Sequence, residues 1–146
     1  METTNDDFLI ADTSGLISLA VQTDVNHSPA ITATKPLQDE QRTILVPYEV
    51  FVETVNVLGK RVGHLGASAV ATYVSTTPLF LVIDTSKQAR QQALTNFEEQ
   101  PPAVSFTDCI VMAVADEYST KMIFGFDADH AKNGYTILAK STRESA

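Results

Sequence analysis

The sequence has one cysteine, no tryptophan and no long uninterrupted apolar run. Cys109 cannot form an internal disulfide, and it cannot build a zinc site with histidines as scattered as His27, His64 and His130. A membrane-spanning helix needs about 18 consecutive apolar residues, which the chain lacks. The first residues also lack the basic start and apolar stretch of a signal peptide. We therefore expect a soluble, cytoplasmic protein with no membrane partner.

Basic residues are also scarce, with 10 Lys and Arg against 18 Asp and Glu, which gives a formal net charge of -8. A field of this sign repels phosphate, so a broad basic face for nucleic acid is not expected. Hydrophobic residues, in contrast, make up 44% of the 146 positions, which is enough for a proper core. The length corresponds to one domain, and we expect a single domain over residues 1–146.

Short apolar runs alternate with longer helical patterns along the whole chain, which is typical of βαβ units. Strands are expected at residues 8–11, 43–46, 79–83, 122–126 and 136–138. Helices are expected at about residues 14–21, 48–61, 67–74, 86–99 and 105–118, with glycines at 63 and 66 ending the second of them. The polar segment 23–41 is expected to be a loop or a short helix. The pattern predicts a three-layer α/β/α fold with a central, mainly parallel sheet of four to five strands.

Acidic residues stand where these elements meet. Asp12 and Asp127 follow predicted strands, Asp108 lies in the first turn of an apolar helix, and Glu53 lies inside the helix after the second strand. Ligands bind at the carboxyl ends of parallel strands, so we expect the four carboxylates to converge there. Their mutual repulsion would cost several kcal/mol at an effective dielectric of about 20, and a divalent cation would remove it. Carboxylate oxygens suit Mg²⁺ or Mn²⁺, and this chemistry predicts metal-assisted phosphodiester hydrolysis.

In order and spacing, these acids resemble the four acidic motifs of PIN-domain ribonucleases, among which the VapC toxins of bacterial and archaeal toxin–antitoxin pairs are the most numerous. The segments that carry the resemblance are FLIADTSGLISLA, VPYEVFVETVNVLGK, SFTDCIVMAVA and IFGFDADHAKNGY, and they span nearly the whole chain. The resemblance implies a central parallel sheet and an endoribonuclease that uses Mg²⁺ or Mn²⁺ to cleave RNA. It also implies a homodimer and, often, inhibition by a cognate antitoxin protein.

The family's functional residues carry over one by one. The positions that match its metal-binding acids are Asp12, Glu53, Asp108 and, as the fourth acid, Asp127. Asp129 matches the second acid of the family's D-x-D ending and would support the metal site. Thr107 stands where the family commonly has Ser or Thr, and its hydroxyl could hold a carboxylate in place. His130 departs from the aromatic residue, usually Phe, that follows D-x-D.

Structural roles compete with these assignments. Asp12 could only cap the following helix, and Asp108 could only complete an S-x-x-D capping box. Glu49, one turn before Glu53, competes for its role, although the sequence around Glu53 is the closer match. Two other functions stay open: a non-catalytic PIN-like module for protein interaction, and a stand-alone PIN nuclease in RNA processing with no antitoxin.

Overall fold

A parallel sheet forms the centre of the computed structural model, which describes residues 5–141. Within these residues the sheet has four strands in the order β3-β2-β1-β4. Their bounds are β1 (Phe8–Ala11), β2 (Thr43–Pro47), β3 (Phe80–Ile83) and β4 (Ile123–Phe124). Ile10 of β1 pairs with Leu45 of β2 on one side and with Ile123 of β4 on the other. The central β1 is therefore hydrogen-bonded along both edges, and the residue that follows it lies in the middle of the sheet's carboxyl edge.

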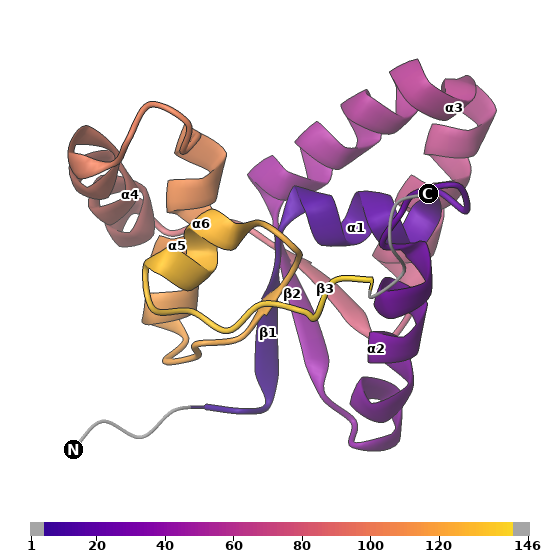
Figure 1. Cartoon of the computed structure of the whole chain (residues 1–146), viewed down its shortest axis with the longest axis horizontal. Coiled ribbons are helices and arrows are strands. Elements are labelled where there is room, and N and C mark those ends of the chain that lie inside the picture. Colours follow the sequence, from indigo (N-terminus) through magenta and orange to yellow (C-terminus); the bar gives the residue numbers. More distant parts are fainter. Residues whose placement is uncertain (1–4, 142–146) are drawn as a thin grey trace.

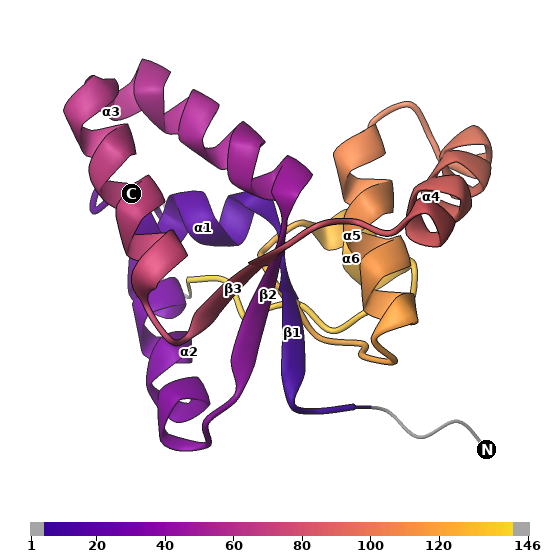
Figure 2. The same ribbon diagram turned by 180° about the vertical axis from the view of Figure 1, so that it is seen from behind.

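Helices cover both faces of this sheet (Figures 1 and 2). One layer contains α1 (Thr13–Ala20), α2 (His27–Asp39) and α3 (Tyr48–Thr76), and the other contains α4 (Lys87–Glu99), α5 (Phe106–Glu117) and α6 (Ala128–Lys132). Residues 109–115 of α5 are all buried, so this helix forms much of the core on its side. The three-layer α/β/α fold with a parallel sheet that the sequence predicts is confirmed. None of the helices in the described part of the chain has the length and apolarity needed to cross a membrane.

The long helix α3 bends at Gly63, whose backbone is not helical (φ 88°, ψ 170°). A positive φ of this size strains any residue with a β-carbon, so glycine suits the bend. The helix break that the sequence predicts at this glycine is confirmed, although the helical segments on its two sides join directly. The N-terminal half of α3 carries Glu53 and packs by its buried Val50 and Leu58.

Two segments differ from the expected secondary structure. Residues 23–41 contain the full helix α2, even though Pro29 and Pro36 lie inside it. Pro29 falls in the first turn, where backbone N–H groups have no helical partner, and the buried Ala30 and Leu37 anchor the helix to the core. The expected strand at 136–138 is reduced to an isolated parallel bridge between Met122 and Thr136. Within the described residues the sheet consequently has four strands, the lower of the two expected numbers.

Candidate active site

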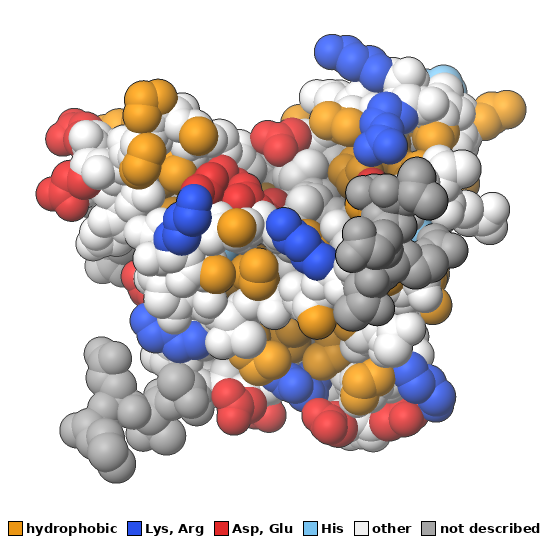
Figure 3. Space-filling view, in the orientation of Figure 1, with side chains coloured by type: hydrophobic (Ala, Val, Ile, Leu, Met, Phe, Trp, Pro, Cys, Tyr) orange, Lys and Arg blue, Asp and Glu red, His pale blue; other side chains and the backbone are white. Residues whose placement is uncertain are grey.

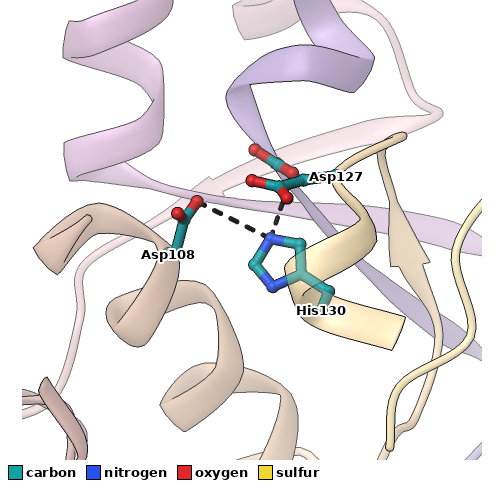
Figure 4. A group of neighbouring side chains, drawn as sticks. Asp108, Asp127 and His130 are labelled. Atoms are coloured by element: carbon teal, nitrogen blue, oxygen red, sulfur yellow. Dashed lines mark hydrogen bonds and ion pairs between the residues drawn. The ribbon is translucent and has the colours of Figure 1, made fainter. Parts of the chain in front are cut away.

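Three aspartates from distant parts of the sequence meet at the carboxyl edge of the sheet. Asp12 follows β1, Asp127 follows β4, and Asp108 lies in the first turn of α5. Each offers a carboxylate oxygen, and these oxygens and a ring nitrogen of His130 all lie within 4.8 Å of one another. Figure 4 shows Asp108 of α5 pointing toward Asp127 and His130, which lie at the start of α6 and within it. In Figure 3 the surface is hollowed between the α4–α5 side and the α3 side, and acidic side chains gather at this hollow.

Each of these aspartates also fixes the start of a helix. Asp12 and Asp127 each accept a hydrogen bond from the backbone N–H two residues further on, at 3.3 and 2.9 Å. Asp108 Oδ2 accepts one from the N–H of Ser105 at 3.0 Å, which completes the predicted capping box. The second oxygens of Asp12 and Asp108 lie 3.0 and 3.8 Å from Nε2 of His130. Capping and clustering are thus combined in these side chains, because one oxygen caps while the other faces the cluster.

Asp12 is the most deeply buried of the three, with 5% of its surface exposed. The hydroxyl of Ser14 donates to Asp12 Oδ2 at 3.2 Å and accepts from the backbone N–H of Phe126 at 3.0 Å, so it links the ends of β1 and β4. Gly125 leaves the space that the Asp12 side chain occupies. A β-carbon at position 125 would lie 2.6 Å from Asp12 Cβ and 2.9 Å from Asp12 Oδ2, which is too close for either contact.

Charge in the cluster is only partly balanced. Burial raises the pKa of Asp108, and the negative charges of Asp12 and Asp127 raise it further, against the lowering effects of the Ser105 hydrogen bond and of His130. Burial acts to lower the pKa of His130, but its hydrogen bond with Asp12 and the charges of the three aspartates outweigh burial and raise that pKa. The site therefore has an excess of negative charge that a bound cation would offset.

Glu53 and Thr107 lie beside this group. The Thr107 hydroxyl donates to Glu53 Oε2 at 3.0 Å, which ties the glutamate of α3 to the residue before Asp108. Glu53 is half-buried but is not among the side chains within 4.8 Å of one another. Its competitor Glu49 contacts other residues: it accepts a hydrogen bond from Thr85 at 2.6 Å and lies 3.9 Å from Arg90. Of the two glutamates, Glu53 is thus the one tied to α5 beside the cluster.

Asp129 is also outside the tight group. Its backbone N–H donates to Asp127, and its carboxylate Oδ1 lies 3.7 Å from Nζ of Lys132, whose side chain is 73% exposed. The side chain of Asp129 is mostly buried, at 25% exposure, and it follows the fourth acid on α6. It lies at the border of the cluster, next to an exposed cation.

A divalent cation such as Mg²⁺ or Mn²⁺ fits the donor set. Three carboxylates converge with excess negative charge, and carboxylate oxygens are the ligands that both ions prefer. The bonds to Ser14, Ser105 and His130 would hold Asp12 and Asp108 in place without such an ion.

Sequence reasoning did not single out three residues that shape the site: Ser14, Gly125 and His130. Ser14 follows Asp12 by two positions, a spacing at which a hydroxyl can reach the capping carboxylate. Gly125 interrupts the apolar run at residues 122–126 that predicts a strand, which is a signal for close approach of another group. In the sequence His130 differs from the family only as a departure from an aromatic residue, and its contact with Asp12, 118 positions away, has no local signature.

The chain belongs to the PIN-domain family, whose model matches residues 9–134. A solved structure similar to it is that of Mycobacterium tuberculosis VapC20, a toxin that cleaves the sarcin–ricin loop. The two share 25% sequence identity with a TM-score of 0.73, over 88% of this chain and 96% of VapC20. No curated protein matches the sequence. The expected family is thereby confirmed, and family and fold together identify a nuclease, that is, a hydrolase of phosphodiester bonds.

Proposed function

We propose that this protein is a metal-dependent endoribonuclease that acts as the toxin of a toxin–antitoxin pair. The observation that carries the proposal is the convergence of Asp12, Asp108 and Asp127 within 4.8 Å at the carboxyl edge of the sheet. These are three of the four acidic positions that match the metal-binding acids of PIN-domain ribonucleases. The similarity to VapC20, an RNA-cleaving toxin, supports RNA as the substrate.

In this proposal Asp12, Asp108 and Asp127 hold the ion, and Glu53 and Asp129 complete the acidic site from its border. A bound Mg²⁺ or Mn²⁺ supplies positive charge that activates water and stabilises charge on the scissile phosphate. Thr107 orients the Glu53 carboxylate through its hydroxyl. Lys132, which is exposed beside Asp129, would contact a phosphate of the bound RNA. The chain's own groups thus position the ion and the substrate.

The net charge of -8 limits how such an enzyme binds RNA. A cation held by the converging acids would attract phosphate, which the acids alone repel. The other acidic residues still give the protein a negative charge that opposes nonspecific binding of RNA. We expect weak affinity for RNA in general and strict dependence on the divalent ion. A cytoplasmic homodimer, inhibited by a cognate antitoxin, completes the proposal.

An RNA cleavage assay tests the enzymatic part. The purified protein is incubated with total RNA and with a sarcin–ricin stem-loop, in Mn²⁺, in Mg²⁺ or in EDTA. The variants Asp12→Asn and Asp108→Asn remove charge while the amide oxygen can still cap the helix. The matched control is Asp39→Asn, an exposed acid that pairs with Lys35 on α2. We expect cleavage only with a divalent ion, at least 100-fold slower in the two site variants and unchanged in the control.

Cleavage that persists both in EDTA and in the two site variants would refute the metal mechanism. A protein that neither cleaves RNA nor binds Mn²⁺ in calorimetric titration would instead be the non-catalytic interaction module. The toxin role has its own test, because expression should arrest growth of the host cell and Asp108→Asn should relieve the arrest. An active nuclease that leaves growth unaffected would be a stand-alone RNA-processing enzyme.

A further inference from the structure

His130 is the one member of the cluster that is not an acid, and it is completely buried. Its Nε2 lies 3.0 Å from Asp12 Oδ2 and 3.8 Å from Asp108 Oδ1. By distance alone it would count as a fourth ligand for a cation, since imidazole nitrogen is a common metal donor. The surroundings of its second ring nitrogen, Nδ1, decide whether His130 binds the cation or instead donates a hydrogen bond to Asp12.

Nδ1 of His130 is buried and has no hydrogen-bond partner among residues 5–141. A histidine that binds a metal through one nitrogen almost always donates the N–H of the other to a carboxylate, a carbonyl or a water. If Nε2 of His130 bound an ion, its hydrogen would have to sit on Nδ1, where it would be a buried donor without an acceptor. That arrangement carries the full desolvation penalty of the N–H group.

The contact with Asp12 requires the opposite tautomer. An ionised carboxylate only accepts hydrogen bonds, so the 3.0 Å contact needs the hydrogen on Nε2. In the neutral ring Nδ1 then has a lone pair and no hydrogen. Both nitrogens are thus consistent with a ring that donates to Asp12, and neither is suited to a ring that binds a cation.

We propose that His130 is a positioning residue, which holds the Asp12 carboxylate through Nε2–H and is not a ligand of the ion. The inference rests on the proposed metal site. Asp12 Oδ2 also accepts from the Ser14 hydroxyl, while Oδ1 accepts from the Ser14 backbone, so the carboxylate is fixed in orientation from two sides. The histidine that replaces the family's usual Phe therefore adds a polar support for the first acid of the site.

Two spectroscopic measurements on the unmodified protein test the tautomer and the coordination. In the metal-free protein, long-range ¹H–¹⁵N correlation of the imidazole rings should show hydrogen on Nε2 of His130, assigned by the loss of its signals in His130→Gln. In the Mn²⁺-loaded protein, electron spin-echo modulation should show no directly bound ¹⁴N. Hydrogen on Nδ1 alone, or a ¹⁴N coupling that disappears in His130→Gln, would overturn the proposal.

A pair of variants separates donation from mere filling of space. The side-chain amide of His130→Gln can place an N–H near the position of Nε2, whereas His130→Phe fills the space and has no donor. We expect Mn²⁺ affinity, measured by calorimetry, to stay within about 3-fold in His130→Gln and to fall by about 10- to 100-fold in His130→Phe. Equal affinity of His130→Phe and the unmodified protein, or an equal loss in both variants, would contradict the role.

These experiments also keep the inference apart from the proposed function. A protein that binds Mn²⁺ and shows the Nε2–H tautomer but cleaves no RNA would refute the nuclease and leave the role of His130 intact. A protein that cleaves RNA but shows directly bound ¹⁴N would support the nuclease and refute the proposed role of His130. If His130→Phe does not fold, the measurements on the unmodified protein still decide.

Discussion

Gly125 gives the sharpest test of how the site is built, because its hydrogen atom faces the Asp12 carboxylate. The substitution Gly125→Ala would place a β-carbon 2.6 Å from Asp12 Cβ and 2.9 Å from Asp12 Oδ2. Both distances are shorter than real contacts allow, so either Asp12 or the end of β4 must move. Gly125 has no positive φ, so the strain would come from lack of space and not from the backbone conformation.

The size of the effect follows from what must move. Overpacking by one methyl group costs about 1–3 kcal/mol in a well-packed interior. Displacing Asp12 would also weaken its hydrogen bonds with Ser14 and His130, which contribute about 1 kcal/mol each. We expect the free energy of unfolding to fall by about 2–4 kcal/mol. We also expect Mn²⁺ affinity to fall by at least 10-fold, as when partners of metal ligands are lost.

Denaturant unfolding in EDTA and calorimetric titration with Mn²⁺ measure the two effects. The matched control is Gly59→Ala in α3, where an added β-carbon would meet nothing within 4 Å. The control should gain about 0.5–1 kcal/mol from the higher helix propensity of alanine and keep its Mn²⁺ affinity. If Gly125→Ala binds Mn²⁺ as the unmodified protein does and is equally stable, the position of Asp12 does not depend on its close packing against residue 125.

Three further predictions concern charge, hydrogen bonding and burial around the same site. Carboxylate oxygens that lie within 4.8 Å of one another repel by about 3 kcal/mol at an effective dielectric of about 20. One kcal/mol shifts the melting temperature of a domain of this size by about 2–4 °C, so Asp108→Asn should raise the melting temperature in EDTA by roughly 6–12 °C. With Mn²⁺ present the same variant should melt below the unmodified protein, and a melting temperature that falls in EDTA would contradict the repulsion. Thr107→Val should leave Glu53 without its hydroxyl partner and weaken Mn²⁺ binding several-fold, whereas Thr107→Ser should preserve the binding. Equal Mn²⁺ affinities of the two variants in calorimetry would show that the Thr107–Glu53 contact does not contribute to metal binding. Burial, together with the charge of Asp108, raises the pKa of Cys109, so the thiol stays protonated at neutral pH. Because the residue is also fully buried, disulfide-exchange reagents should label it at least 100-fold more slowly in the native protein than in denaturant, and fast native labelling would refute this.

The positions of the acids could be predicted because they depend on local patterns. The apolar run before Asp12 identified a buried strand, and the S-x-x-D pattern placed Asp108 in the first turn of α5. Parallel strands bring their carboxyl ends to one edge, so the convergence of Asp12, Asp108 and Asp127 follows from the topology. Glu53 was assigned by its surrounding sequence, and the structure adds the contact with Thr107 that ties it to α5.

Long-range contacts could not be predicted in the same way. Leu37 and Ala30 make α2 a helix through burial against the core, which outweighs the two prolines that suggested a loop. The segment after α6 joins the sheet by a single bridge at Thr136, although its apolar residues suggested a strand. His130 reaches Asp12 only because α6 folds back over the ends of β1 and β4. Each of these features depends on which surfaces the fold brings together, and no short window of sequence contains that information.

The three aspartates would be a poor choice if helix capping were their only task. At the N-cap, which Asp12 and Asp127 occupy, Ser, Thr and Asn serve about as well as Asp and add no negative charge. At the third helical position, which Asp108 occupies, a neutral Gln can complete the capping box. The same chain shows this at α4, where Ser86 is the N-cap and accepts from the N–H of Ala89 at 3.0 Å. Asp12, Asp108 and Asp127 instead place three carboxylates within 4.8 Å, with a cost in repulsion that capping does not require. Acids at these three helix starts, with a serine at the start of α4, are what the proposed site for a divalent cation requires.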